Sequence, residues 1–179
     1  QPEFRVHLLQ CRPQASQTTG QAIEVPTTVS EADTIFSADR LVPHGRVKRI
    51  RHIVFVDPEV YARIPDETTR LQVARVIGKL NQVLEEKSFI LMGPGRWGSA
   101  NIDLGVKVTY ADIYHTAALI EIALSDGKSV PEASYGTHFF QDLVEASIYP
   151  LALYPGQGDI VFNWRFLRES ANVLGDLLP

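Results

Sequence analysis

The sequence predicts one α+β domain, with an irregular α/β arrangement in which a mixed sheet is flanked by helices. The length of 179 residues suits a single domain with its own apolar core. Hydrophobic residues make up 45% of the chain and charged residues 21%, which excludes wholesale disorder and a coiled coil. Segments typical of strands and helices follow one another without strict alternation, so the sheet is expected to be mixed.

Charge and cysteine content narrow the class of protein. The net charge of −4 argues against a dedicated nucleic-acid binder. A single cysteine, Cys11, excludes an internal disulfide and a multi-cysteine zinc site, as expected of a cytoplasmic protein. No run approaches the roughly 20 apolar residues of a membrane span, so no membrane partner is expected. The chain starts at Gln1 without an initiator methionine or a signal-peptide pattern, and we expect it to be a piece of a longer protein.

The first third of the chain contains three strand candidates. Residues 4–11 alternate apolar and polar side chains before becoming continuously apolar, and Pro13 ends that pattern. Residues 14–21 are rich in Gln, Ser and Thr, which indicates a linker. Residues 22–29 and 34–37 are further short strand candidates.

The middle of the chain gives the clearest signals. A basic stretch leads into apolar residues at the end of 47–56, which predicts a strand, and a short helix is expected to follow through Tyr61. Apolar residues recur every three or four positions over 66–86, which predicts a helix with Asp66 as its N-cap. Residues 89–92 are continuously apolar, which predicts a buried strand.

The last third alternates between strand and helix signals. Residues 116–124 are apolar except for Glu121; periodicity alone permits either structure, and a strand is favoured. Thr137 is a candidate cap for a helix over 138–146. A strand over 148–154 and a terminal helix near 167–174 complete the expected order.

The loop after the 89–92 strand, Gly-Pro-Gly-Arg-Trp-Gly-Ser, is the strongest candidate for a binding site. Glycines let backbone amides approach an anion, a guanidinium fits phosphate or carboxylate, and an indole offers a flat face. The spacing matches neither a Walker loop nor a dinucleotide fingerprint. A tight turn around a buried tryptophan, with the arginine paired to a carboxylate, explains the same residues equally well. The candidate contacts are Gly93, Gly95, Arg96, Trp97, Gly98 and Ser99.

Thr137 and His138 form a second candidate. A histidine at the start of a helix lies where backbone amides face outward, so it could contact an anion. A hydrogen-bonded boundary residue beside Phe139 and Phe140 is the favoured interpretation. No histidine spacing supports a metal site. The basic run 44–52 is interpreted as a strand with a solvated face rather than as a phosphate-binding patch.

Two sets of motifs carry a resemblance to a known family. Leu8-Leu9-Gln10-Cys11-Arg12-Pro13 resembles the last strand of the ATP-grasp nucleotide-binding domain of phosphoenolpyruvate synthases and pyruvate phosphate dikinases. The resemblance implies that Gln10 helps hold Mg²⁺ and that Arg12 reaches the phosphates of ATP, roles that suit an amide oxygen and a guanidinium.

The rest of the chain resembles the C-terminal region that follows this domain in some bacterial phosphoenolpyruvate synthase-like proteins. Segments 91–99, 104–106 and 136–143 carry that resemblance. It implies a terminal ATP-grasp strand at 1–13, a linker at 14–21 and an accessory domain at 22–179. ATP and Mg²⁺ would then belong to the full-length kinase or transferase.

Departures from the family limit what this chain can do. The segment 136–138 imitates a phosphohistidine motif, but Tyr135 replaces a glycine and two phenylalanines replace small residues, so His138 is not expected to carry phosphate. The PEP/pyruvate barrel and nearly all of the ATP-grasp domain are missing. Whether the parent protein is an active enzyme stays open, and this chain is not expected to catalyse phosphotransfer alone.

Three functions remain. The leading expectation is an accessory domain that binds a phosphate-bearing small molecule through Arg96 and the Thr137–His138 segment, or docks on the rest of its own polypeptide. The alternative is a structural or homodimerising module, in which Trp97 and Phe139 lie in a dry contact. A hydrolase or transferase using His138 as a base ranks last, because no residue pairing supports it.

Overall fold

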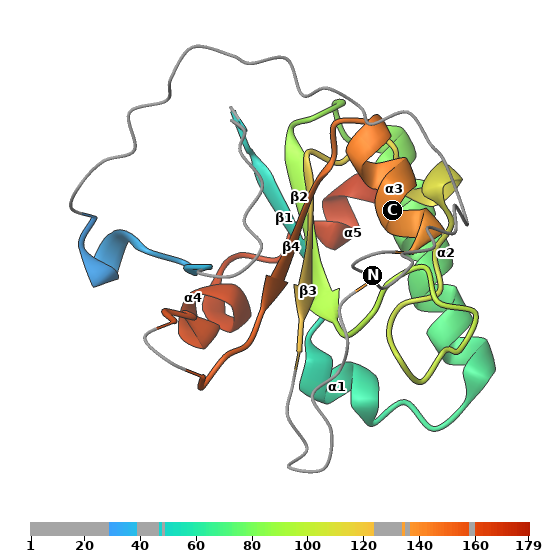
Figure 1. The fold of residues 1–179 in the computed structure, drawn as a ribbon, viewed down its shortest axis with the longest axis horizontal. Helices are drawn as coiled ribbons and strands as arrows, with labels where there is room; N and C mark the ends of the chain where they lie inside the picture. Colours follow the sequence, from blue (N-terminus) through green and yellow to red (C-terminus); the bar gives the residue numbers. More distant parts are fainter. Residues whose placement is uncertain (1–28, 39–46, 48, 124–133, 135–136, 158–159) are drawn as a thin grey trace, which may run out of the picture.

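A computed structural model describes residues 29–38, 47, 49–123, 134, 137–157 and 160–179 of the chain. Five α-helices and a four-stranded sheet lie in one domain, which confirms the expected α+β class (Figure 1). The strands are β1 (His52–Phe55), β2 (Phe89–Pro94), β3 (Ala118–Ile122) and β4 (Tyr149–Leu153). The helices are α1 (Pro58–Ala62), α2 (Glu67–Val83), α3 (His138–Glu145), α4 (Trp164–Glu169) and α5 (Leu174–Leu177), with 3₁₀ turns η1 (Glu31–Asp33) and η2 (Tyr110–Asp112).

The four strands are parallel and lie in the order β1-β2-β3-β4, so the sheet that the structure describes is not mixed. Each pair of neighbouring strands is joined by a crossover, as parallel pairing requires. Only the β2–β3 crossover lacks an α-helix: it contains the glycine-rich loop and η2. Because this crossover has no α-helix, the sequence does not show the strict alternation of strands and helices that is typical of a parallel sheet.

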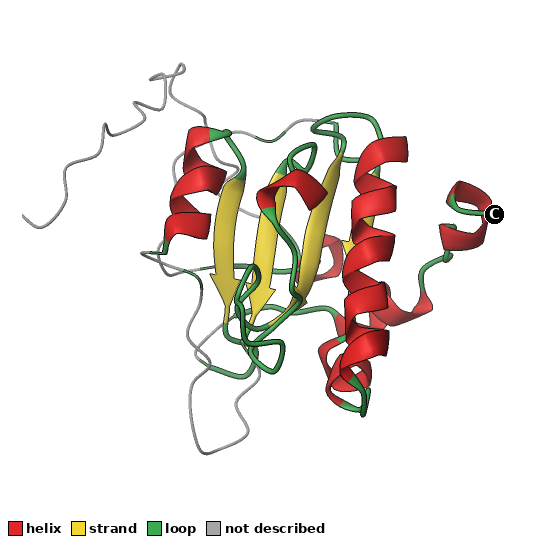
Figure 2. Ribbon diagram, turned by 90° about the vertical axis from the view of Figure 1, so that its right-hand side faces the viewer, coloured by secondary structure: helices red, strands yellow, loops and turns green. Residues whose placement is uncertain are grey.

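The sheet separates two apolar clusters. On one face, α2 and α3 pack against the sheet through residues such as Ile77, Leu80 and Leu143, together with Trp97 (Figure 2). On the other face, Met92, Ile120 and Leu153 meet Phe36, Phe162, Trp164 and Leu167. β2 and β3 are buried on both faces, which explains their continuous apolar sequences.

Side-chain caps begin the helices where the sequence predicted them. The Asp66 carboxylate accepts a hydrogen bond from Thr69 N–H, and the Thr137 hydroxyl accepts one from Phe140 N–H. Asp57 caps α1, the short helix expected after the first described strand. The favoured strand interpretation of 116–124 is confirmed by β3.

Two elements differ from expectation. The single terminal helix near 167–174 is instead two short helices, α4 and α5, because Ser170 has an extended backbone and ends α4. The 34–37 strand is reduced to one antiparallel bridge between Phe36 and Phe162. The strand and linker expected at 4–21, with Gln10 and Arg12, and most of the 22–29 candidate lie outside the described residues.

Candidate functional site

The candidate loop leaves β2 at the carboxyl edge of the sheet, the edge at which open parallel sheets bind ligands. Glu121, on the neighbouring strand β3, lies in register with Gly93. Its carboxylate accepts hydrogen bonds from Trp97 N–H at 2.8 Å and Ser134 N–H at 2.6 Å, and a third from the Ser134 hydroxyl. Ser134 Oγ also lies 2.9 Å from the Trp97 carbonyl oxygen, to which it is the donor in an alternative hydroxyl orientation. The buried carboxylate of Glu121 therefore links the glycine-rich loop to Ser134, which precedes α3, through hydrogen bonds to both.

Burial dominates the electrostatics of Glu121. Only 7% of the residue is exposed, and desolvation raises the pKa of its carboxyl above the usual value. The hydrogen bonds from Ser134 and Trp97, and the positive charge of Arg96, offset part of that increase. Sequence reasoning did not select Glu121 as a site residue, although its position as the single charged residue in an apolar strand was the available signal.

The glycines of the loop are explained by close packing. A Cβ on Gly93 would lie 2.8 Å from the Trp97 ring, and one on Gly95 would lie 1.9 Å from the Leu104 carbonyl oxygen. Gly98 has a φ of +68°, and a Cβ there would lie 2.6 Å from the Phe139 ring. These positions need glycine whether or not a ligand binds.

The backbone amides of the loop are already used. Gly95 N–H donates to Ile122 O, Arg96 N–H to Leu104 O and Gly98 N–H to Val106 O. Trp97 N–H donates to Glu121. The loop therefore does not offer these four amides to an anion. The Trp97 side chain is 1% exposed, so its ring is part of the core and not a platform for a ligand.

Arg96 is the charged residue of the loop, and its guanidinium is the loop's candidate ligand-binding group. The residue is half-buried, and no carboxylate in the described part of the chain lies within ion-pair distance of its guanidinium. Glu121 interacts with it only as a nearby charge. Ser99 is half-buried, and its hydroxyl accepts a hydrogen bond from Asn101 N–H.

The two candidate segments converge. Gly98 packs against the Phe139 ring of α3, and Ser134 reaches the carbonyl of Trp97. Thr137 uses its hydroxyl twice, accepting from Phe140 N–H and donating to Ser134 O. His138 lies exposed in the first turn of α3. Arg96, Ser99 and His138 thus belong to segments held together at one edge of the sheet.

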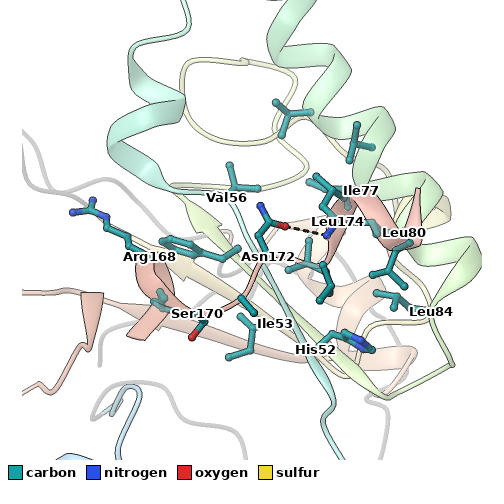
Figure 3. Close-up of a pocket in the computed structure, with 18 of the residues that line it drawn as sticks. His52, Ile53, Val56, Ile77, Leu80, Leu84, Arg168, Ser170, Asn172 and Leu174 are labelled. Atoms are coloured by element: carbon teal, nitrogen blue, oxygen red, sulfur yellow. Dashed lines mark hydrogen bonds between the residues drawn. The ribbon is translucent and has the colours of Figure 1, made fainter. Parts of the chain in front are cut away.

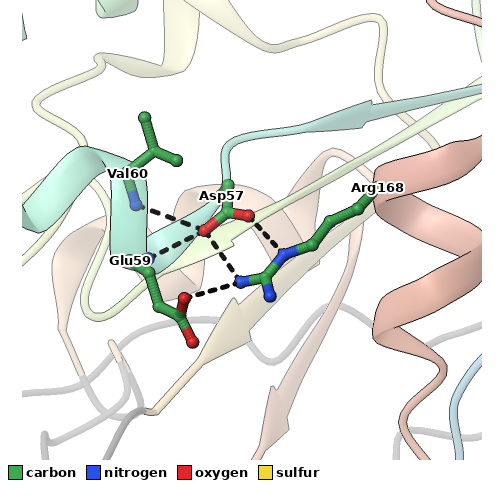
Figure 4. A network of polar contacts seen from close by, with 4 residues as sticks. All are labelled: Asp57, Glu59, Val60 and Arg168. Carbon is green, nitrogen blue, oxygen red and sulfur yellow. Dashed lines mark hydrogen bonds and ion pairs between the residues drawn. The ribbon is translucent and has the colours of Figure 1, made fainter.

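The carboxyl end of β1 contains a further polar network at this edge (Figure 4). Asp57 caps α1 and pairs with Arg168 of α4 at 2.7 Å, and Arg168 also pairs with Glu59 at 3.0 Å. Burial alone would raise the pKa of Asp57, but hydrogen bonds from Arg168 and from two backbone amides outweigh it and hold that pKa below its usual value. Its interactions are complete, so we interpret this network as structural.

Comparisons with known proteins identify no relative: no family model, curated protein or solved structure matches the chain. Within the described residues, no three His, Cys, Asp or Glu side chains gather as metal ligands. None of the described helices combines the length and apolar character needed to cross a bilayer.

Proposed function

We propose that the chain is an accessory domain of a phosphoenolpyruvate synthase-like protein and that it binds a phosphate- or carboxylate-bearing ligand through Arg96. The ATP, the Mg²⁺ and the kinase chemistry would belong to the rest of that cytoplasmic polypeptide, and this chain would not catalyse phosphotransfer alone. The observation that carries the proposal is that Arg96 is a half-buried residue whose charge no described carboxylate neutralises. An anionic ligand would supply the opposite charge that this guanidinium lacks.

Thermal unfolding of the chain tests this function against inorganic phosphate, phosphoenolpyruvate, pyruvate and ATP with Mg²⁺. A ligand at 100 times its dissociation constant adds about 2.7 kcal/mol to the free energy of unfolding. We expect at least one probe to raise the midpoint, Arg96→Ala to abolish that rise, and Arg96→Lys to weaken it because lysine lacks the planar fork.

The matched control is Arg75→Ala, which removes an exposed arginine of α2. This variant should keep the response to the ligand. An unchanged midpoint with every probe, or a full response in Arg96→Ala, would contradict anion binding at this edge.

A structural or homodimerising module is the second candidate, and the dry packing of the loop favours it. Trp97 is buried against Gly93, and Phe139 covers Gly98. If the chain is such a module, no anion should raise the midpoint of its thermal unfolding. Sedimentation at several protein concentrations would then show whether the chain forms a dimer. A chain that stays monomeric would fit a module that docks on the rest of its own polypeptide.

A further inference from the structure

A groove of about 1080 Å³ lies between β1, one face of α2 and the C-terminal segment from α4 to α5 (Figure 3). β1 is the edge strand of the described sheet and pairs only with β2 among the described strands. Leu167 packs on one face of the sheet and Leu177 on the other, so the residues between them cross beyond the edge of β1. The C-terminal segment therefore forms a wall of the groove across from the strand.

The walls of this groove are mostly apolar and partly exposed. Val54 of β1 and Ile77 of α2 line it, together with Phe166, Val173 and Leu174 of the C-terminal segment. The last three are large apolar residues, and each is 40–43% exposed. Exposed apolar surface gathered in one place marks a binding site. Sites for small molecules are clefts with mostly apolar walls and volumes of roughly 300–1,000 Å³. The groove therefore suits a ligand that is largely apolar.

The groove extends along α2. The residues of this helix that line it run from Thr69 to Leu80, over which the helix rises about 16 Å. A linear chain of about twelve carbons has a similar length, given the length of a C–C bond. The dimensions therefore favour a linear apolar chain.

The charged side chains that line the groove are basic. They are Arg51 and Arg168, and none of the described lining residues is Asp or Glu. Arg168 is already paired with Asp57 and Glu59. Arg51 pairs with Glu85 through one nitrogen at 3.0 Å, and the two side chains are 65% and 68% exposed. An ion pair this exposed contributes little stability, so the guanidinium of Arg51 can turn to an anionic ligand.

His52 contributes a polar atom without a partner at the same end of the groove. It begins β1 directly after Arg51 and lies beside Leu84, where α2 ends (Figure 3). Its Nδ1 is buried and has no hydrogen-bond partner in the described structure. Such atoms are uncommon in folded proteins. The χ2 torsion of histidine is soft, so the ring can turn Nδ1 toward a ligand, and a neutral imidazole can donate from this nitrogen. The amino end of β1 thus offers a cation and a donor, which suit a carboxylate.

We propose that this groove binds a linear amphipathic carboxylate of the fatty-acid type. Its apolar chain lies between β1, α2 and the C-terminal segment, and its carboxylate lies between Arg51 and His52. The proposal is independent of anion binding at Arg96, because Arg96 follows the carboxyl end of β2 and Arg51 precedes the amino end of β1. In a parallel sheet these are opposite edges.

Calorimetric titration of the full chain with octanoate, decanoate and dodecanoate, each below its micellar concentration, tests the proposal. We expect one molecule to bind per chain, with the affinity rising about fourfold for each methylene group that the groove buries. Decyltrimethylammonium carries a similar chain with the opposite charge and should bind at least about tenfold more weakly than decanoate. Inorganic phosphate, the probe for Arg96, should not compete with dodecanoate.

Variants locate the ligand in the groove. Val73→Trp places a large ring in the groove and should weaken dodecanoate binding by more than about tenfold. The matched control is Val83→Trp on the same helix, because Val83 is 53% exposed and does not line the groove. Arg51→Ala should weaken carboxylate binding several-fold and leave decyltrimethylammonium unaffected, whereas Arg75→Ala should change neither. These two arginine variants keep the test decisive if Val73→Trp does not fold.

Several results would overturn the proposal. Absence of dodecanoate binding, or equal affinities for decanoate and decyltrimethylammonium, would exclude a site for amphipathic carboxylates. Equal effects of the two tryptophan variants would show that the ligand binds elsewhere. Competition by phosphate would move the carboxylate to Arg96. A wild-type chain that sediments as a dimer, and as a monomer when it carries Val73→Trp, would assign the groove to a second copy.

Discussion

Replacing Gly98 by alanine tests whether packing explains the glycine-rich loop. Gly98 has a φ of +68°, and a Cβ there would lie 2.6 to 2.8 Å from three atoms of the Phe139 ring. The left-handed backbone costs alanine about 1 kcal/mol or more, and overpacking a fitted contact adds about 1–3 kcal/mol. Reduced freedom of the unfolded chain returns about 0.4–1 kcal/mol. We therefore expect Gly98→Ala to lower the free energy of unfolding by about 1–4 kcal/mol.

Gly156→Ala is the matched control for this experiment. Gly156 also has a positive φ, +83°, but a Cβ there would have no heavy atom within 4 Å. This variant carries the backbone cost of about 1 kcal/mol, less the same return from the unfolded chain, and no overpacking, so its loss should be below about 1 kcal/mol. Urea unfolding at constant pH measures both variants on the same scale.

Removing the ring isolates the contact between Gly98 and Phe139. Phe139→Ala is destabilising in the wild-type background, but it also removes the clash in Gly98→Ala. The double variant should be more stable than the sum of the single losses by about 1–2 kcal/mol. Equal losses for Gly98→Ala and Gly156→Ala, or strict additivity in the cycle, would refute the packing explanation and reopen a ligand-related role for this glycine.

Three further predictions concern single positions. The wild type should lose stability relative to Glu121→Gln as the pH rises above 4.5, because burial raises the pKa of this carboxyl in the folded state. The wild type should lose its advantage over Asp57→Asn as the pH falls below 3.8, because Arg168 and backbone donors lower that pKa. Ser147→Gly should stabilise the chain by up to about 1 kcal/mol, because Ser147 has a φ of +55° and an exposed side chain.

The signs of the two pH effects are opposite and can be checked in one series of urea titrations. For Glu121, the raised pKa in the folded state stabilises the protein at low pH, and this stability is lost as the carboxyl ionises. For Asp57, the lowered pKa stabilises the protein at higher pH, and this stability is lost as the carboxylate is protonated. Parallel pH profiles for wild type and either variant would contradict the corresponding assignment. For Ser147→Gly, the control is Ser170→Gly, where φ is −64° and glycine should destabilise.

Local patterns predicted most of the elements. The three- and four-residue spacing over α2, together with the cap at Asp66, is determined within one stretch of chain, and the structure confirms it. Strand direction is not local information, because a parallel and an antiparallel partner can bury the same apolar run. For that reason the sequence predicted a mixed sheet, whereas the four described strands are all parallel.

The candidate site shows the same limit. The sequence identified the loop at 93–99 and the start of α3, and the structure brings them together. It could not reveal why the glycines are there, because the atoms that exclude a Cβ come from distant positions such as Val56, Leu104 and Phe139. The sequence shows Glu121 as the single charged residue of an apolar strand. Its hydrogen bonds from Trp97 N–H and Ser134 N–H can be identified only in the folded chain.

The glycine-rich loop and the edge of β1 are two regions where the fold leaves interactions incomplete. In the glycine-rich loop, packing and Glu121 satisfy the backbone amides from Gly95 to Gly98, so a ligand has to be bound by side chains, chiefly Arg96. Beside β1 the side chains form an apolar groove, whereas the backbone N–H groups of Ile53 and Phe55 have no hydrogen-bond partner among the described residues outside the sheet.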